Sequence, residues 1–455
     1  MANIQYFSTN MKSPKVSFGD ALLKGLAPDG GLYMPDRIPC FTKAELDAFS
    51  TMPYHEIAFN VFDKFLEGEI PSEELRKMTK DAYDFDIPLE NVHDRSYVMR
   101  LDQGPTASFK DFAGRMMGRL MQYFLKKQDK SLLILTATSG DTGSAVANAF
   151  YGLDNINVVV LFPQDEVTDR QRKQMTTLQN NIQIIALDGK FDDCQALVKQ
   201  AFTDNDLETL NLSSANSINI GRLLPQAVYY IYAYAKLRKQ GGEDQIIYSV
   251  PSGNFGDLMG GVIAKRMGVP VKRFVVAVNG NDEFPKLLAF KKYEKIEPSH
   301  NCLSSAMNVG HPSNLARLIE LYNGNMDEKG NIHRDPDFDA LRKDFFTRSV
   351  SDQETRDTIK AVYNKYKVVL EPHGSVGWNC LERFLEQEPQ LDKQLIVTLE
   401  TAHPAKFPAS ILEILGFDPE LPQSLKGLES KQEQFDNLPN DYFTFKKYLN
   451  TKYKV

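Results

Sequence analysis

Short apolar segments alternate with amphipathic segments through the middle of the chain. The apolar, β-branched segments predict strands at 132–138, 158–163 and 182–187, and the amphipathic segments predict helices at 142–151, 167–178 and 192–202. A second series predicts strands at 246–250, 274–279, 367–370 and 395–400, with helices at 222–240 and 257–267. Strands separated by single helices are typical of parallel sheets, so we expect an α/β protein with mostly parallel sheets.

The same pattern divides the chain into three parts. Residues 1–105 are irregular, with short helices expected at 17–25, 54–66 and 72–83, and we expect this segment to be part of the large domain. The pattern predicts a small, mobile α/β domain over residues 106–212 and a large α/β domain over residues 213–455. Residues 281–347 are a polar insertion with short helices, and the charged residues after Phe417 predict a strap over the surface.

The composition excludes several functional classes. The 455 residues are 42% hydrophobic and 25% charged with a net charge of −7, which disfavours nucleic acid and anionic membranes as partners. We expect a cytoplasmic chain, because no apolar run approaches the roughly 20 residues of a membrane helix and no signal core is visible at the start. The 4 cysteines and 7 histidines show no metal or disulfide spacing, so we expect no metal site and buried, reduced thiols at Cys40, Cys194, Cys302 and Cys380.

The segment GPTASFKD, residues 104–111, places Lys110 in the first turn of a predicted helix. Phe109, Ala113 and Met117 belong to an apolar face wide enough to be buried, and Lys110 lies off that face. The positive end of the helix dipole disfavours a cation there and lowers the pKa of the lysine. A neutral amine in this position can attack a carbonyl and form a Schiff base. A solvated surface lysine is the alternative on this segment alone.

Two glycine-containing turns follow predicted strands and can each hold an anion. The turn TSGDTGSA, residues 138–145, offers hydroxyls and backbone N–H groups to an anion the size of a carboxylate. It has G-x-x-G where a dinucleotide fingerprint needs G-x-G-x-x-G, so a dehydrogenase is disfavoured. In PSGNFGD, residues 251–257, Gly253 and Gly256 let the backbone approach a phosphate, although a tight connection without a ligand remains an equal alternative.

A third polar segment, residues 213–222, contains SANSINIGR at the start of a long predicted helix. Its Arg222 has the side chain best shaped to bind a phosphate through parallel hydrogen bonds. Helix capping by the Asn and Ser residues is the alternative. One candidate amine and three candidate anion sites, two of them suited to phosphate, are what a pyridoxal 5'-phosphate enzyme needs to act on a phosphorylated amino acid.

The ordered motifs resemble the threonine synthase family, in the tryptophan synthase β-like group of pyridoxal-phosphate enzymes (fold type II). The resemblance covers nearly the whole chain and rests on GLAPDGGLYMP (25–35), GPTASFKDFAGR, TSGDTGSA, SANSINIGR, PSGNFGD, GHPSN (310–314), EPHGSVG (371–377) and ETAHPAKF (400–407). It implies a carbon–oxygen lyase that converts O-phospho-L-homoserine and water to L-threonine and phosphate. We expect a monomer or a homodimer.

The resemblance also assigns roles to individual residues. It makes Lys110 the Schiff-base lysine and the base that removes the Cα proton. It assigns the cofactor phosphate to Gly253, Asn254, Phe255, Gly256 and Asp257, and the pyridine nitrogen to Thr401. It assigns the substrate phosphate to Asn216, Ser217 and Arg222, and the substrate carboxylate to Ser139, Thr142 and Gly143. Asp141 departs from the Asn of many relatives, and its role stays open because a second anion beside the cofactor phenolate would be repelled.

Other functions remain compatible with the same motifs. A threonine or serine dehydratase would share Lys110 and both glycine turns but would not need a phosphate site at 216–222. A phospho-lyase would stop before water addition and release a keto acid. A non-catalytic protein could bind a phosphorylated ligand on the same scaffold, although the intact Lys110 argues against it.

Overall fold

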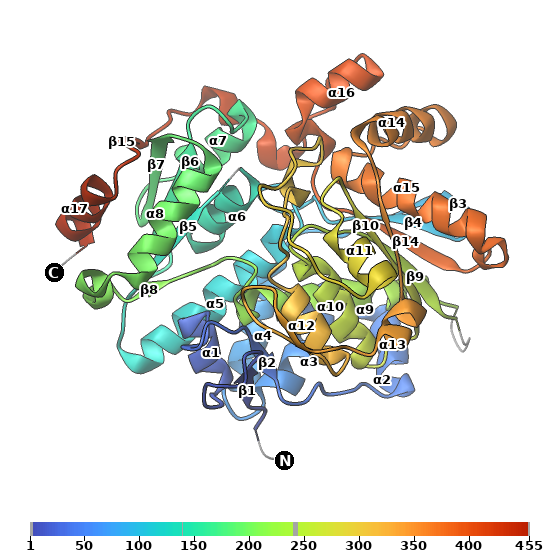
Figure 1. Ribbon diagram of the computed structural model, residues 1–455, viewed down its shortest axis with the longest axis horizontal. Helices are drawn as coiled ribbons and strands as arrows, with labels where there is room; N and C mark the ends of the chain where they lie inside the picture. Colours follow the sequence, from blue (N-terminus) through green and yellow to red (C-terminus); the bar gives the residue numbers. More distant parts are fainter. Residues whose placement is uncertain (1–2, 139, 240–243, 454–455) are drawn as a thin grey trace.

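The computed structural model describes residues 3–138, 140–239 and 244–453, in which two sheets organise the chain (Figure 1). Within these residues the larger sheet has six strands, in the order β13 (Phe345–Ser349), β10 (Val271–Val278), β9 (Ile246–Pro251), β14 (Leu395–Glu400), β4 (Ser96–Arg100) and β3 (Leu89–His93). The smaller has five, in the order β15 (Asp436–Pro439), β7 (Ile182–Asp188), β6 (Ile156–Pro163), β5 (Leu132–Ala137) and β8 (Leu212–Ser213). Neighbouring strands in both sheets are parallel except for the antiparallel pair β3 and β4, which confirms the predicted α/β class.

Both faces of the smaller sheet are covered by helices. Alternate residues such as Leu133 and Leu135 face α8 (Phe191–Thr203) and α17 (Tyr442–Tyr453). The residues between them, including Ile134, pack in the main core with α6 (Asp141–Phe150). A strand buried on both faces is apolar along most of its length, which explains the near-continuous apolar segments of the sequence.

The larger sheet is covered in the same way. The helix α15 (Pro372–Gln387) packs on one face through Val376, Cys380 and Phe384, with α14 (Asp352–Tyr366) outside it (Figure 1). The helices α9 (Ile220–Leu237) and α10 (Gly256–Arg266) pack against each other in the main core, which also contains Tyr248 and Val250 of β9.

The helix α5 (Lys110–Gln128) connects the two sheets, because it packs on α6 of the smaller unit and on α9 of the larger unit (Figure 1). Gly114 and Gly118 face α6, where an added Cβ would come within 3.1 Å of the Ala149 Cβ and within 3.0 Å of the Ala149 carbonyl oxygen, respectively. Small residues at these positions let the two helix backbones approach closely, which holds α5 against the smaller unit.

The remaining elements surround these layers. The N-terminal segment contributes β1 (Tyr6–Ser8), α1 (Phe18–Lys24), β2 (Tyr33–Pro35), α2 (Lys43–Ala48), α3 (Tyr54–Leu66) and α4 (Ser72–Ala82). The insertion contributes α11 (Glu283–Phe290), α12 (Leu315–Leu321), β11 (Asn325–Met326), β12 (Ile332–Arg334) and α13 (Phe338–Asp344). None of the helices in the described residues is long and apolar enough to cross a membrane.

Several sequence-based expectations differ from the structure. Residues 367–370 form no strand, because Lys367 caps α14 in a left-handed conformation and the chain then leads into α15. The segment after Phe417 is more than a surface strap, since its β15 pairs with β7 and its α17 covers α8 (Figure 1). The described cysteines are free thiols, but Cys40 is exposed and Cys302 half-buried, where buried thiols were expected. The proposed domain boundaries remain a prediction.

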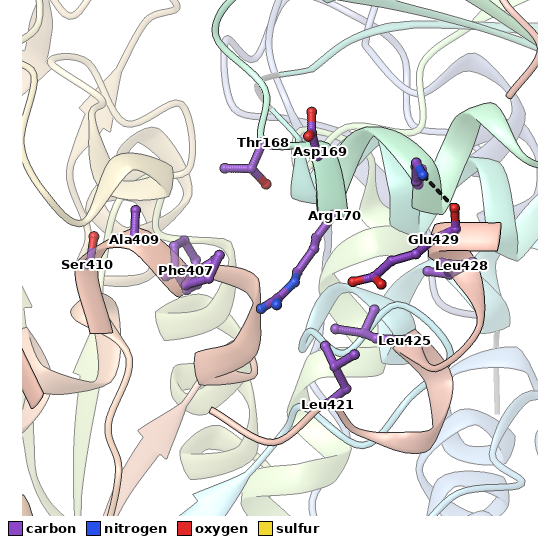
Figure 2. Close-up of a pocket in the computed structure, with 12 residues that line it drawn as sticks. Thr168, Asp169, Arg170, Phe407, Ala409, Ser410, Leu421, Leu425, Leu428 and Glu429 are labelled. Carbon is purple, nitrogen blue, oxygen red and sulfur yellow. Dashed lines mark hydrogen bonds between the residues drawn. The ribbon is translucent and has the colours of Figure 1, made fainter. Parts of the chain in front are cut away.

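A cavity of about 530 Å³ lies between the smaller unit and the C-terminal segment. Figure 2 shows Arg170 of α7 (Asp169–Thr176) reaching from one wall toward Phe407 and Leu421 of the other. Its guanidinium donates to the Ala405 carbonyl oxygen at 2.7 Å and forms an ion pair with Asp418. Polar contacts therefore hold α7 to the segment that follows β14.

Candidate active site

Lys110 is the first residue of α5, as the sequence predicts. The loop before it is tied to the residues after β14, because the Phe109 N–H donates to the Thr401 carbonyl oxygen at 2.9 Å. The His403 N–H likewise donates to the Ala107 carbonyl oxygen at 3.0 Å. These bonds place the Lys110 side chain, which is 13% exposed, between the carboxyl end of the larger sheet and the start of α6.

Burial sets the charge properties of Lys110. It lowers the pKa of the ammonium, Asp141 opposes the shift, and the positive charges of Lys406 and Arg222 add to it. The predicted direction is therefore the one found, but its main cause is burial where the sequence suggested the helix dipole. The Lys110 Nζ is 3.8 Å from the nearest Asp141 oxygen, longer than a hydrogen bond, so the amine is not held tightly.

Asp141 is paired mainly with a second lysine. Its Oδ1 lies 2.7 Å from the Lys406 Nζ and accepts a hydrogen bond from the Gln171 Nε2 at 3.0 Å. Burial alone would raise the pKa of Asp141, but the charges of Lys406 and Lys110 outweigh it and hold the pKa below its ordinary value. Asp141 is thus an anion whose charge Lys406 balances, which reduces the repulsion expected between this carboxylate and a cofactor phenolate.

The PSGNFGD turn ends β9 and starts α10, as expected. Gly253 is packed so closely that an added Cβ would lie 2.8 Å from the Met307 Cα. Phe255 adopts a left-handed backbone conformation, with φ of 61°, and its ring packs edge-on against Phe284. Asn254 donates to the Ser217 hydroxyl and accepts from the Ser313 N–H, both at 2.5 Å. The N–H groups of the first helical turn have no partners within the helix, so the turn can bind a phosphate.

Asp257 and Gly256 belong to the same turn but have different surroundings. The Asp257 carboxylate accepts hydrogen bonds from the hydroxyls of Tyr229 and Tyr230 at 2.6 and 2.7 Å, which attach α10 to α9. Burial raises the pKa of Asp257 to about 6, although these hydrogen bonds oppose the shift. Gly256 faces the predicted substrate-phosphate segment, where an added Cβ would lie 3.4 Å from the Ser217 Cβ.

The segment that contains Asn216, Ser217 and Arg222 therefore borders the glycine turn. Asn216 accepts a hydrogen bond from the Thr136 hydroxyl at the end of β5, at 2.9 Å. The Arg222 Nη1 donates to the Ala215 carbonyl oxygen at 2.6 Å, and burial lowers the pKa of the guanidinium to about 10. Its Nε has no hydrogen-bond partner in the described part of the chain. An almost fully buried cation with an unused N–H is suited to an anionic ligand.

The predicted carboxylate site lies at the start of α6. Ser139 falls outside the described residues. The N–H groups of Gly140 and Gly143 both donate to the Thr138 hydroxyl, at 2.9 and 2.8 Å. Thr142 is half-exposed and stands beside Asp141 in the first turn. The turn thus presents the positive end of a ten-residue helix next to the Lys110–Asp141 pair.

Thr401 is hydrogen-bonded to a buried acid that sequence reasoning did not single out. Its hydroxyl lies 3.2 Å from the Glu371 Oε1, and Glu371 also accepts from the N–H groups of His373 and Gly374. The His373 Nε2 accepts from the Ala306 N–H, so the ring proton is on Nδ1 and points to Glu371. The Thr401 hydroxyl donates to this carboxylate over 3.2 Å, a long hydrogen bond that the hydroxyl can exchange for one to an acceptor atom of a ligand.

Two further residues were missed although their motifs were recognised. Lys406 lies in ETAHPAKF and has no exposed side-chain surface. Arg317 follows GHPSN, is completely buried and donates to the carbonyl oxygens of Tyr33 and Ile218, which supports the segment carrying Ser217. In both cases the available signal was a single cation within a segment of mostly apolar residues. That signal did not identify the partner of the cation, which can lie hundreds of residues away in the sequence.

These observations define the class of protein. Two buried polar atoms have no partner in the described residues: the hydroxyl of Ser108, two residues before Lys110, and the Nε of Arg222, whose charge acts on Lys110. Unused donors beside a buried amine fit pyridoxal phosphate with a phosphorylated substrate. Residues 86–401 match the family model described as pyridoxal-phosphate-dependent enzyme. The chain is therefore a pyridoxal-phosphate-dependent enzyme of fold type II. No cluster of His, Cys, Asp and Glu in residues 3–138, 140–239 and 244–453 could hold a metal ion.

Within this class, the chain belongs to the threonine synthase family. Residues 5–83 match the model for the threonine synthase N terminus, and residues 375–449 match the C-terminal model. Threonine synthase of Haemophilus influenzae is 40% identical over 443 residues, covering 97% of this chain and 98% of that protein. The structure of pyridoxal-phosphate-bound threonine synthase from Brucella melitensis superposes with a TM-score of 0.93 at 35% identity, covering 100% of both chains. That of Escherichia coli threonine synthase gives 0.86 at 37% identity, with 98% and 99% coverage.

Proposed function

We propose that this enzyme converts O-phospho-L-homoserine and water to L-threonine and phosphate, and that the residues described above carry out the steps. The observation that supports it most directly is the arrangement around Lys110. A glycine turn suited to a cofactor phosphate borders the segment that carries Arg222, a buried arginine suited to a substrate phosphate, and the charge of Arg222 acts on the loosely held amine of Lys110. A dehydratase would have no use for the second of these sites.

Pyridoxal phosphate, when bound, supplies an electron sink for the charge released at the substrate Cα. Lys110 would hold its aldehyde, and the turn from Gly253 to Asp257 would hold its phosphate. Thr401 would donate its hydroxyl proton to the pyridine nitrogen, which is an acceptor, in place of the 3.2 Å contact that the hydroxyl makes with Glu371 in this structure. Within the turn, the Asp257 side chain supports α10 through Tyr229 and Tyr230, and its contribution to cofactor binding is through the backbone.

Lys110 has the properties of a general base in this reaction. Once the substrate amine displaces it, a neutral amine beside the substrate can accept the Cα proton, and the lowered pKa of Lys110 favours this neutral form. Asp141, 3.8 Å away, can stabilise the ammonium form that results. The pair can therefore take up a proton and release it again within a largely buried site.

Arg222, Asn216 and Ser217 would bind the substrate phosphate and stabilise its charge as it leaves Cγ. The N-terminus of α6, with Thr142 and Gly143, would bind the substrate carboxylate, and the same role for Ser139 is proposed from the sequence motif alone. The phosphate site lies on the segment that leads from β8 of the smaller sheet into α9 of the larger unit, and the carboxylate site lies at α6 of the smaller unit, so a substrate that fills both would favour closure of the smaller unit. Closure excludes water during elimination, and reopening admits it for addition at Cβ.

Product analysis tests this function. The purified protein is supplied with pyridoxal phosphate and O-phospho-L-homoserine, and threonine and inorganic phosphate are quantified over time. We expect equal amounts of the two products, and neither from the Lys110→Ala variant. Phosphate released together with a keto acid and ammonia would indicate a phospho-lyase, and a failure to release phosphate would overturn the proposal.

We further infer that the enzyme works in the cytoplasm as a monomer or a homodimer. Its substrate and product are small water-soluble amino acids, and its net charge of −7 disfavours nucleic acid as a partner. Gel filtration with light scattering would measure the mass directly. A stable assembly larger than a dimer would contradict this inference.

A further inference from the structure

The active site contains a second lysine to which the proposed reaction gives no task. Lys406 follows β14 in the short helix η5 (Pro404–Lys406), and its side chain is 0% exposed. Its Nζ lies 2.7 Å from the Asp141 Oδ1 and donates to the Thr106 carbonyl oxygen at 2.8 Å. Both lysines thus contact the same carboxylate, Lys406 through Oδ1 and Lys110 through Oδ2.

The charges around Lys110 oppose each other. The charged groups that face it are Asp141, Lys406, Arg222 and Glu371, of which the two acids favour the ammonium and the two cations disfavour it. Asp141 is the strongest opponent of the shift that burial imposes. Around Lys406 itself stand Asp141, Lys110 and, at longer range, Asp111 and His403.

We propose that Lys406 is a positioning residue that occupies Asp141 and so prevents this carboxylate from holding Lys110 as an ammonium ion. The inference rests on the proposed role of Lys110, because an ammonium has no lone pair with which to attack the cofactor aldehyde. With Lys406 in place, Asp141 forms its short ion pair with Lys406, at 2.7 Å, and keeps a longer contact of 3.8 Å with Lys110.

The geometry favours this role over a simple packing role. Asp141 lies at the start of α6 in the smaller unit, whereas Lys406 follows a strand of the larger sheet. The Thr106 carbonyl oxygen that fixes the Lys406 Nζ lies on the loop leading to Lys110. Thr106 is itself bound to Asp111 in the first turn of α5, through its N–H at 2.9 Å and its hydroxyl at 2.6 Å. Lys406 is thereby held at a fixed distance from the reacting amine.

The test measures how fast the full-length protein, stripped of cofactor, forms its visible band with added pyridoxal phosphate between pH 6 and pH 9.5. The rate follows the neutral fraction of Lys110, and the titrations of free cofactor are common to all variants. Lys406→Met leaves Asp141 to Lys110, so we expect the midpoint of the profile to rise by about one pH unit or more and the rate at pH 7 to fall about tenfold. Asp141→Asn should move the midpoint in the opposite direction.

The double variant Asp141→Asn/Lys406→Met separates charge from packing. It removes both charges of the pair, so its midpoint should return toward that of the wild type and lie above that of Asp141→Asn. The comparison of the double variant with Asp141→Asn can be made even if the single variant Lys406→Met does not fold. Lys236→Met is the matched control, since Lys236 is a half-buried lysine that also donates to backbone carbonyls, and its profile should equal the wild-type profile.

Two outcomes would overturn the proposal. One is a Lys406→Met profile with a wild-type midpoint. The other is a double variant whose midpoint equals that of Asp141→Asn, which would mean that the charge of Lys406 has no influence on Lys110. The assay contains no amino-acid substrate, so its result stays readable whether or not the enzyme makes threonine.

Discussion

Replacement of Arg222 tests whether this residue is the receptor for the substrate phosphate. Arg222 is the third residue of α9, is 4% exposed, and keeps its Nε without a partner in the described residues while one Nη1 hydrogen binds the Ala215 carbonyl. Arg222→Ala removes the cation and leaves the glycine turn in place. We expect it to weaken productive binding of O-phospho-L-homoserine far more than binding of the cofactor.

The expected size of the effect follows from the contacts available. Burial lowers the pKa of Arg222 to about 10, so the guanidinium is still charged at pH 8. A hydrogen bond to a charged group contributes about 1.5–3 kcal/mol, and a bidentate contact with phosphate therefore about 3–5 kcal/mol. At about 1.4 kcal/mol per factor of ten, kcat/KM should fall roughly 100-fold to a few thousand-fold. Arg222→Lys keeps the positive charge but lacks the two parallel N–H donors of arginine, so its kcat/KM should lie between those of wild type and Arg222→Ala.

The assay compares kcat/KM for O-phospho-L-homoserine with the dissociation constant of pyridoxal phosphate in the same variant. The cofactor constant should change less than about threefold, well under 1.4 kcal/mol. Arg238→Met is a matched control, because Arg238 is a buried arginine at the other end of α9, paired with Asp47. It should lower stability and leave kcat/KM unchanged.

Two results would refute this reasoning. If Arg222→Ala weakened cofactor and substrate binding equally, Arg222 would belong to the cofactor phosphate site. If it changed neither, the substrate phosphate would bind elsewhere and the segment 213–222 would have the capping role that its Asn and Ser residues also allow.

Three other variants test the surrounding structure. The carboxyl group that Asp257→Asn removes has a pKa of about 6 in the folded protein and of about 3.9 in the unfolded chain. Its contribution to the stability of the native state is therefore complete below about pH 3.9, and roughly 3 kcal/mol of that contribution is lost as the pH rises through 6. Urea unfolding should therefore find the variant more stable relative to wild type at pH 8 than at pH 5. A stability difference between the two proteins that does not depend on pH would contradict this. Glu371→Gln replaces a carboxylate that accepts hydrogen bonds from Thr401, His373 and Gly374. It should lower the free energy of unfolding by about 1–3 kcal/mol, measured by thermal unfolding, while Lys110 still reacts with the cofactor. An unchanged unfolding temperature would argue against this hydrogen-bond network. Gly253→Ala would place a Cβ 2.8 Å from the Met307 Cα and should weaken cofactor binding about tenfold or more, whereas Gly377→Ala, with its nearest contact at 3.4 Å, should not.

The sequence was sufficient for the features that depend on local pattern. The strands of the smaller sheet are continuous apolar segments because helices cover both faces, and the helix start at Lys110 follows a Gly-Pro break and an apolar stripe. Glycine spacing after β9 identified the turn at Gly253 in the same way, since close backbone approach requires the missing side chain.

Features that depend on distant partners could not be predicted. The strand β15 is only four residues long, and it forms because β7, about 250 residues earlier, offers a free edge. The polar strand β3 is half-exposed and lacks the apolar signal of a core strand. The pairing of Lys406 with Asp141 joins residues from two sheets, so neither motif alone indicated that the other would balance its charge.

Chemical trapping tests the central claim most directly. The holoenzyme is treated with borohydride, digested, and its peptides are analysed by mass spectrometry. We predict a reduced cofactor adduct on Lys110 and an unmodified Lys406. An adduct on Lys406, or a protein that carries no adduct after reduction, would contradict the account.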